Sequence, residues 1–161
     1  MSASPTAAAD PLTLERQVCF ALAVTNRAVL AVYRPLLEPL GLTHPQYLVM
    51  LGLWDHHRKS PGDALSVKQI AALLQLDSAT LSPMLKRLEA LGLLSRSRSI
   101  TDERATEVRL TDAGVALRER AVGIPAAVTE RLGVDVEELE QLHVVLSRVN
   151  KAALAAGALP P

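Results

Sequence analysis

The chain has few aromatic residues and a single cysteine. Among its 161 residues only Phe20, Tyr33, Tyr47 and Trp54 are aromatic, while Ala and Leu, which favour helices, dominate. This composition argues against a large β-sandwich. Because Cys19 is alone, neither an intrachain disulfide nor a cysteine-based zinc finger can form. A lone thiol is typical of a reducing compartment, so we expect a cytoplasmic protein.

The chain also lacks net charge and long apolar runs. Basic and acidic residues balance at 17 each, so any nucleic-acid footprint has to be local. No uninterrupted apolar run reaches the roughly 18 residues that a membrane span requires. The N-terminus has neither the basic nor the apolar region of a signal peptide. We expect residues 1–11 to form a disordered tail and residues 12–160 to form one domain.

Apolar residues at intervals of three and four predict a chain built mainly from helices. Asp10 before Pro11 suggests the N-cap of the first helix, and Pro35 should bend or break that helix. Pro83 conflicts with its predicted helix but lies near the helix start, where the cost is smaller. The predicted helices cover 12–40, 44–57, 66–74 and 78–91. A further helix begins at Thr111 and is interrupted near Gly123 and Pro125. The last begins at Asp135, with Glu138 three residues on in a relative of the capping box, and ends near Gly157.

Two short alternating segments, 94–98 and 106–110, flank the seven residues 99–105, whose tip is polar and charged, and predict a β-hairpin. Helices followed by a hairpin are the element order of a winged helix-turn-helix. We therefore predict a mainly α fold with a small β-hairpin wing, in which residues 65–110 bind DNA. The flanking segments, 12–41 and 111–157, carry more apolar surface than so small a unit can cover. They are therefore predicted to form a homodimer, most simply around a two-fold axis.

The helix predicted over 78–91 takes the place of a recognition helix, whose N-terminal end enters the major groove. Its outward side chains begin with small hydroxyls, which allow close approach to base edges, and continue with a basic pair that reaches phosphates or guanine. Residues 58–109 carry nine basic and six acidic residues, so positive charge is local to this stretch. The predicted DNA contacts on this helix are Ser78, Thr80, Ser82, Pro83, Lys86 and Arg87.

The tip of the predicted hairpin adds three candidate DNA contacts, namely Arg98, Asp102 and Arg104. Arginine suits a narrow minor groove, and Asp102 is placed to orient Arg104 through a charge-assisted hydrogen bond. From charge alone, a solvated surface explains these residues as well as a DNA interface does. The order of the helices and the hairpin favours DNA binding.

Cys19 lies early in the first predicted helix, on or beside its apolar stripe. A lone cysteine is most often a small buried hydrophobe, and a reactive one needs a stabilised thiolate and access to solvent. Tyr33 is fourteen residues further on, which is roughly 21 Å along an unbroken helix. The two side chains can therefore meet only across a dimer interface or after a sharp fold of the chain. Tyr33 is otherwise an ordinary interface aromatic.

Several segments resemble the organic-hydroperoxide repressors, the OhrR branch of the MarR transcription regulators. Residues 17–22 (QVCFAL), 33–37 (YRPLL) and 42–48 (LTHPQYL) are similar to the first two helices of that branch. Residues 76–89 (LDSATLSPMLKRLE) are very close to its recognition helix, and 102–104 (DER) match its wing tip. The similarity covers roughly residues 12 to 125, and the last helix matches only in character.

The resemblance implies a homodimeric repressor that binds a pseudo-palindromic operator and releases it when an organic hydroperoxide oxidises Cys19. It also implies that Tyr33 hydrogen-bonds the thiolate of the partner subunit. Without a second cysteine the chain is similar to the one-cysteine class, in which a small thiol traps the sulfenic acid as a mixed disulfide. The chain departs from the family at Ala23, where a second tyrosine is usual, and at His44, where tyrosine is frequent.

Three other functions remain open. The first is a regulator of the same fold that binds a small aromatic acid or drug and leaves Cys19 inert. The second is a thiol peroxidase, but Arg16 occupies the threonine position of a Thr-x-x-Cys pattern and no resolving cysteine exists. The third is a zinc protein, but adjacent histidines chelate poorly and no HExxH motif occurs among His44, His56, His57 and His143. We therefore expect neither enzyme activity nor a metal or other cofactor.

Overall fold

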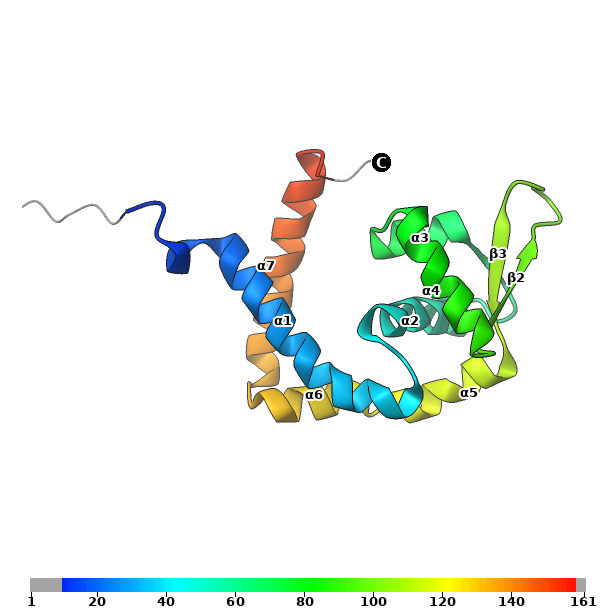
Figure 1. Ribbon diagram of the computed structural model, residues 1–161, viewed down its shortest axis with the longest axis horizontal. Coiled ribbons are helices and arrows are strands. Elements are labelled where there is room, and N and C mark those ends of the chain that lie inside the picture. Colours follow the sequence, from blue (N-terminus) through cyan, green and yellow to red (C-terminus); the bar gives the residue numbers. More distant parts are fainter. Residues whose placement is uncertain (1–9, 159–161) are drawn as a thin grey trace, which may run out of the picture.

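The computed structural model describes residues 10–158 (Figure 1). It confirms the predicted mainly α fold with a small antiparallel sheet. The elements, with η for 3-10 helices, are η1 (Leu14–Arg16), α1 (Val18–Leu37), η2 (Glu38–Leu40), α2 (His44–Lys59), β1 (Leu65–Ser66), α3 (Val67–Leu74), α4 (Ser78–Ala90), β2 (Leu94–Arg98), β3 (Thr106–Leu110), α5 (Asp112–Ala121), α6 (Ile124–Leu132) and α7 (Val136–Ala155).

The start of the first long helix differs from the prediction. Asp10 does not cap it: its carboxylate accepts the Leu12 N–H at 2.9 Å and closes a turn, and η1 follows. Gln17 is extended, because its side-chain amide is held by the Pro11 carbonyl oxygen at 2.7 Å. The α-helix therefore begins at Val18 rather than at residue 12. The predicted tail lies outside the described residues, except for Asp10 and Pro11, which form this turn.

Pro35 does not break α1, which continues through it to Leu37. A proline this close to a helix end removes only one main-chain donor, and the chain then tightens into η2. Gly41 ends the segment with φ 70°, a conformation that favours glycine. Thr43 caps α2 in a complete capping box with Gln46, as expected for a helix beginning there.

The sheet has one more strand than the sequence predicted. β1 pairs with β3 through Leu65 opposite Val108, and β3 pairs with β2 from Leu94 opposite Leu110 to Arg98 opposite Thr106. All three strands are antiparallel, in the order β1-β3-β2. β1 has only two residues, too few to show alternation, and the sequence pattern assigns Ser66 to the helix that follows.

A continuous core holds α4 in place. Ile70 and Ala71 of α3 are buried, and so are three leucines on the inner face of α4. Pro83 leaves α4 intact, since it is the sixth residue of the helix and only one carbonyl loses its helical donor. The other core side chains come mainly from α2 and the sheet; the set around α4 comprises Met50, Leu53, Trp54, Leu81, Leu85, Leu88, Leu94 and Val108.

The terminal helices leave most of their apolar side chains at least partly exposed. No residue of α7 is buried, and Leu37 is the single buried residue of α1. Figure 1 shows α1 and α7 on one side and α2 to α4 with the β2–β3 hairpin on the other, joined along α5 and α6. Asn150 of α7 still reaches the helix-turn-helix, where its side-chain amide donates to the Gln75 side chain at 3.1 Å.

Length and composition alone would allow the segment Val18–Leu40 to cross a membrane, and only 6% of its most apolar stretch is buried. Core helices of soluble proteins and signal sequences pass the same test. Asp135 occupies the N-cap position of α7, as predicted, but its side chain makes no capping bond, so the expected capping box is absent there.

Candidate DNA interface and thiol site

The recognition helix α4 presents its predicted DNA-contacting side chains to solvent. All six are exposed except Ser82, which is half-buried. Asp77 caps the helix: one carboxylate oxygen accepts the Thr80 N–H at 2.7 Å and the other accepts the Thr80 hydroxyl at 2.9 Å. These bonds, the main-chain one foremost, hold the pKa of Asp77 below its usual value. The buried leucines fix the opposite face, so α4 stands as a rigid exposed ridge.

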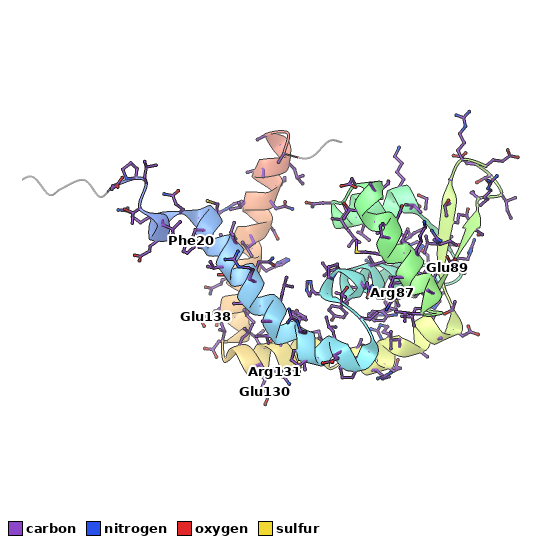
Figure 2. All side chains as sticks on the ribbon, in the orientation of Figure 1. Phe20, Arg87, Glu89, Glu130, Arg131 and Glu138 are labelled. Carbon is purple, nitrogen blue, oxygen red and sulfur yellow. The ribbon has the colours of Figure 1, made fainter. Side chains whose placement is uncertain are left out.

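Two hydroxyls near the start of α4 are already used as donors. Thr80 donates to Asp77, and Ser82 donates to the carbonyl oxygen of Ser78 at 2.7 Å. Their oxygen lone pairs remain free to accept from base amino groups. Lys86 and Arg87 lie about one turn further along and stay exposed; Arg87 is labelled in Figure 2.

The wing carries Arg98, Asp102 and Arg104 as predicted, and all three are exposed. The interaction expected between Asp102 and the Arg104 guanidinium is not the one formed. Instead, the Asp102 carboxylate accepts the main-chain N–H of Arg104 at 3.0 Å. A short acidic side chain two residues before a free N–H closes a local turn more readily than it reaches a long arginine. The guanidinium is therefore left for an external partner.

A groove of about 500 Å³ brings part of this set together between α3, α4 and the wing. It adds two residues that the sequence analysis missed, Ser66 and Lys68 at the start of α3. Lys68 was counted in the local positive charge, but only β1 and the wing place the start of α3 beside α4. The polar residues that line the groove are Ser66, Lys68, Ser78, Ser82, Arg96, Asp102, Arg104 and Thr106.

Arg96 has a structural partner within this groove. Its guanidinium donates to one carboxylate oxygen of Glu89 at 2.7 and 3.0 Å, and its main-chain N–H donates to the other at 3.0 Å. The guanidinium bonds hold the pKa of Glu89 below its usual value. This ion pair and the main-chain bond tie β2 to the C-terminal half of α4, so the wing and the recognition helix keep a fixed relation.

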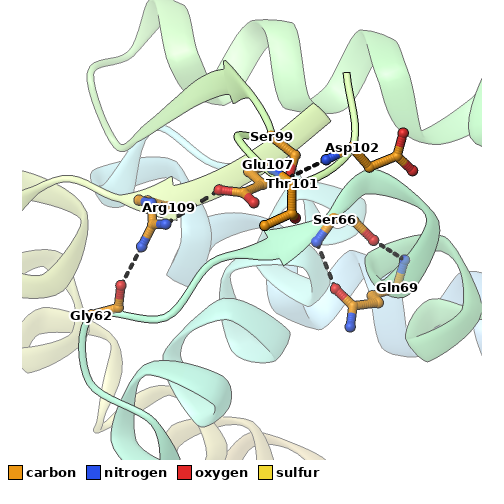
Figure 3. A network of polar contacts seen from close by, with 8 residues as sticks. All are labelled: Gly62, Ser66, Gln69, Ser99, Thr101, Asp102, Glu107 and Arg109. Carbon is orange, nitrogen blue, oxygen red and sulfur yellow. Dashed lines mark hydrogen bonds and ion pairs between the residues drawn. The ribbon is translucent and has the colours of Figure 1, made fainter. Parts of the chain in front are cut away.

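The base of the wing is tied to the rest of the sheet (Figure 3). The Arg109 guanidinium donates to the carbonyl oxygen of Gly62 and pairs with Glu107 at 3.2 Å. Ser66, the partner of Glu107 in the sheet, forms a capping box with Gln69 at the start of α3. The wing, β1 and α3 are therefore linked by main-chain and side-chain bonds.

Cys19 is exposed and lies at the second residue of α1. In this first turn the main-chain N–H groups lack helical acceptors and attract negative charge. The later start of the helix places the sulfur there, whereas a helix from residue 12 would have placed it in the second or third turn. α1 runs unbroken from Val18 to Leu37, so a sharp fold that would bring Cys19 to Tyr33 is excluded within one chain.

Tyr33 lies in an aromatic cluster at the far end of α1. The centroid of its ring lies 4.8 Å from that of His44, in an edge-on arrangement, and 6.0 Å from that of Tyr47. Burial lowers the pKa of His44, which favours the neutral imidazole. Burial, and secondarily Tyr33, raises the pKa of Tyr47. His44 therefore packs as a neutral ring against Tyr33, a role that the sequence did not reveal.

A second groove, of about 570 Å³, adjoins this cluster between α1 and α2. Most of its lining is apolar, with Arg34, Glu38 and His44 as its ionisable side chains. Within residues 10–158 no group of three or more His, Cys, Asp or Glu residues lies close enough together to hold a metal ion.

Comparison with known proteins places the chain in a family. The family model described as transcriptional regulator SarA/Rot matches residues 31–120. The organic hydroperoxide resistance transcriptional regulator of Bacillus subtilis (strain 168) is 43% identical over 137 residues, which cover 85% of this chain and 89% of that protein.

Solved structures share the fold. Reduced AbfR bound to DNA, a protein of Staphylococcus epidermidis, superposes with a TM-score of 0.74 at 30% identity and covers 89% of this chain and 94% of that one. BpsR of Bordetella bronchiseptica, whose DNA binding is regulated by 6-hydroxynicotinic acid, has a TM-score of 0.74 at 25% identity over 87% and 97% of the two chains.

These relatives are regulators of transcription and not enzymes, and the extent of the identity includes the helix-turn-helix and the wing. The chain accordingly belongs to the winged-helix MarR/SarA-type regulators, in the organic-hydroperoxide-repressor branch, and is a DNA-binding transcription regulator.

Proposed function

We propose that the protein is a homodimeric, cytoplasmic repressor that releases its operator when an organic hydroperoxide oxidises Cys19. The reduced dimer binds a pseudo-palindrome with its two α4 helices about one DNA turn apart, near 34–36 Å. The predicted contacts on α4 read the major groove, and Arg98, Asp102 and Arg104 of the wing contact the backbone and the minor groove. Oxidation changes the dimer interface and with it the spacing of the two helices.

The position of Cys19 carries this proposal. The sulfur is exposed in the first turn of a helix whose neighbouring apolar side chains, Val18 and Leu22, are 67% and 42% exposed. A sensor thiol buried in the chain's own core would be cut off from peroxide, whereas this one lies on a surface that needs a partner subunit. The uncovered apolar side chains of α7 extend that surface.

The partner subunit then completes the sensor. Tyr33 and Cys19 are about 21 Å apart along one helix, so the Tyr33 hydroxyl donates to Cys19 of the other subunit. With Ala23 in place of the second tyrosine that the family resemblance leads one to expect, Tyr33 is the main tyrosine donor in this site. His44 supports it by holding the Tyr33 ring edge-on.

The chemistry has two balanced steps. The Cys19 thiolate attacks the outer oxygen of the hydroperoxide, the O–O bond breaks, and the products are a cysteine sulfenic acid and the alcohol ROH, after one proton reaches the leaving oxygen. A small cellular thiol then attacks the sulfenic sulfur, forms a mixed disulfide and releases water. The bulky polar adduct no longer fits the apolar surface around Val18 and Leu22, so the two subunits shift.

The test is DNA binding before and after peroxide. The probe is a duplex selected by the reduced wild-type protein from a random pool, and binding is followed by fluorescence anisotropy. Cumene hydroperoxide with glutathione should release the wild-type protein, and mass spectrometry should find one glutathione on Cys19. The Cys19→Ser variant should bind the duplex as tightly and stay bound; release of this variant would overturn the mechanism.

Methionine oxidation needs its own control. Met84 lies half-buried on α4, and its conversion to a polar sulfoxide would disturb the recognition helix without any role for Cys19. The Met84→Leu variant keeps the volume and removes this oxidisable sulfur from α4. It should be released by cumene hydroperoxide as the wild-type protein is; loss of release in this variant would assign the sensor to α4.

A second candidate function is release by a small aromatic acid, with Cys19 inert. The groove of about 570 Å³ beside His44, with Arg34 on its lining, favours it because a guanidinium pairs with a carboxylate. BpsR, a regulator of the same fold, responds to 6-hydroxynicotinic acid. Thermal shifts of the Cys19→Ser protein with small phenolic acids, followed by loss of DNA binding, would establish this function in place of peroxide sensing.

A further inference from the structure

Ile100 is the most exposed large apolar side chain in the part of the chain that the structure describes, with 99% of its surface accessible. It lies in the tip between β2 and β3. Every other residue from Ser99 to Arg104 is polar or charged, as is usual for a hairpin tip. A branched aliphatic side chain at this place has no core to join within its own chain.

The exposure of Ile100 results from an ordered tip. Ser99 is only 7% exposed, its main-chain N–H donates to the Ala105 carbonyl at 2.9 Å, and its hydroxyl contacts the Thr101 hydroxyl at 3.1 Å. The Ser99 hydroxyl oxygen also accepts the N–H groups of Thr101 and Asp102. Figure 3 shows this cluster of Ser99, Thr101 and Asp102 above the base of the wing. Ile100 is therefore held out from a fixed turn.

The surroundings of Ile100 are those of a polyanion contact. Arg98 and Arg104 flank it in sequence and are both exposed. Arg104 and Asp102, in the same tip, line the groove that the wing shares with the N-terminal end of α4. When α4 lies in a major groove, this tip reaches the neighbouring backbone and minor groove.

We propose that Ile100 is an apolar DNA contact at the wing tip, which packs against the sugars and floor of the minor groove and selects A·T over G·C pairs there. This inference rests on the proposed function, because it takes α4 as the major-groove element. The structure supplies the side chain, its fixed projection and its cationic neighbours.

The chemistry gives the direction of the selectivity. In the minor groove a G·C pair differs from an A·T pair by the guanine N2 amino group. An isoleucine packed on that amino group removes it from water and offers no acceptor, which is unfavourable. An A·T pair presents no such donor, and apolar sugar atoms fill the rest of the contact.

The experiment uses the selected duplex and changes the minor-groove edge alone. At each position flanking the α4 site, an A·T pair is replaced by G·C or by inosine·C, which lacks the N2 amino group but keeps the major-groove edge of G·C. Wild-type protein should lose about five- to tenfold affinity on G·C at the wing position and recover most of it on inosine·C. In Ile100→Ser the G·C to inosine·C ratio should fall close to one.

Two matched variants separate this contact from charge. Ile100→Leu keeps an apolar side chain and should retain the selectivity. Arg104→Ala should lower the salt dependence of binding by about one unit of slope, whereas Ile100→Ser should leave that slope unchanged because it removes no charge. Since Ile100 is almost wholly exposed, its replacement should leave the melting temperature unaltered.

The outcomes distinguish failure of the proposed function from failure of the Ile100 contact. If the wild-type protein selects no duplex, the proposed function fails. If it binds a selected duplex and Ile100→Ser has the same affinity and the same G·C to inosine·C ratio as the wild type, this inference is overturned and the proposed function stands.

Discussion

The indole N–H of Trp54 donates a buried hydrogen bond of 2.8 Å to the carbonyl oxygen of Gly114. The two residues are 60 positions apart and join α2, near the centre of the core, to the first turn of α5. Gly114 itself lies against the chain after α4: a Cβ built on it would be 1.9 Å from the Leu93 carbonyl oxygen. Gly114 thus allows α5 to pack closely against both α2 and the segment that follows the recognition helix α4.

Gly114→Ala should destabilise the fold, because the added methyl overlaps main-chain atoms that cannot move aside as a flexible side chain does. We expect a loss of roughly 1–3 kcal/mol or more in the free energy of unfolding, measured by urea denaturation. Gly123→Ala is the matched control, since its Cβ would meet nothing within 4 Å and its φ is negative. Equal stabilities of the two variants would contradict the close packing at Gly114.

Trp54→Phe should cost about 0.5–1.5 kcal/mol beyond the lost volume, because the buried bond from the indole N–H to the Gly114 carbonyl oxygen is lost. The same denaturation series measures it. Leu88→Ala, a core truncation on α4 with no hydrogen bond involved, should cost roughly 2–5 kcal/mol and provides the scale for a pure packing loss. Wild-type stability of Trp54→Phe would show that the indole bond contributes nothing.

Glu89→Gln should remove an acid-sensitive link between α4 and β2. Arg96 lowers the pKa of Glu89 in the folded protein. The pair therefore contributes its full stabilisation at pH values above 4.5, the ordinary pKa of this carboxyl group. That contribution is lost as the pH falls through the lower folded-state pKa. Wild type should be more stable than Glu89→Gln at pH 7, and the difference should shrink below about pH 4.5. A difference independent of pH would argue against this assignment.

Tyr33→Phe should slow the oxidation of Cys19 by peroxide while leaving DNA binding of the reduced protein intact. The variant removes the hydroxyl and keeps the ring that packs on His44. Samples quenched at increasing times after mixing with cumene hydroperoxide, analysed by mass spectrometry of Cys19, give the rate of oxidation. His44→Gln would test the supporting contact in the same assay. An unchanged rate in Tyr33→Phe would place the thiolate's donor elsewhere.

Arg87→Ala and Lys86→Ala should both weaken binding to the selected duplex and lower its salt dependence, each by about one unit of slope where a phosphate contact is lost. A variant that also relaxes the preference for one base pair identifies the side chain that reads guanine, at a cost of about 1–3 kcal/mol. Titrations at several salt concentrations separate the two effects.

The sequence predicted the elements around α4 because their signals are local. Helical spacing located Leu81, Leu85 and Leu88, and hydroxyl caps marked the helix starts at Thr43 and Thr111. β1 was missed because two residues carry no period. The start of α1 was misplaced because the extended Gln17 depends on its own side-chain bonds to the preceding turn, which no pattern of apolar residues encodes.

The candidate site, too, was predictable only where its sequence signals are local. The exposed face of α4 follows from periodicity, whereas the groove that adds Ser66 and Lys68 requires the pairing of β1 with β3. The neutral packing of His44 on Tyr33 depends on how α1 and α2 cross, which sequence spacing leaves open.

The length of α2 has a mechanical consequence. Its first residue, His44, lies against Tyr33, and Trp54, in its second half, is bonded to α5. Sixteen helical residues form a stiff strut of about 24 Å, too short to bend appreciably. A displacement of the Tyr33 ring at one end would tilt the whole of α2. The recognition helix α4, which packs against α2, would then move with it as a rigid body and not through a series of small side-chain adjustments.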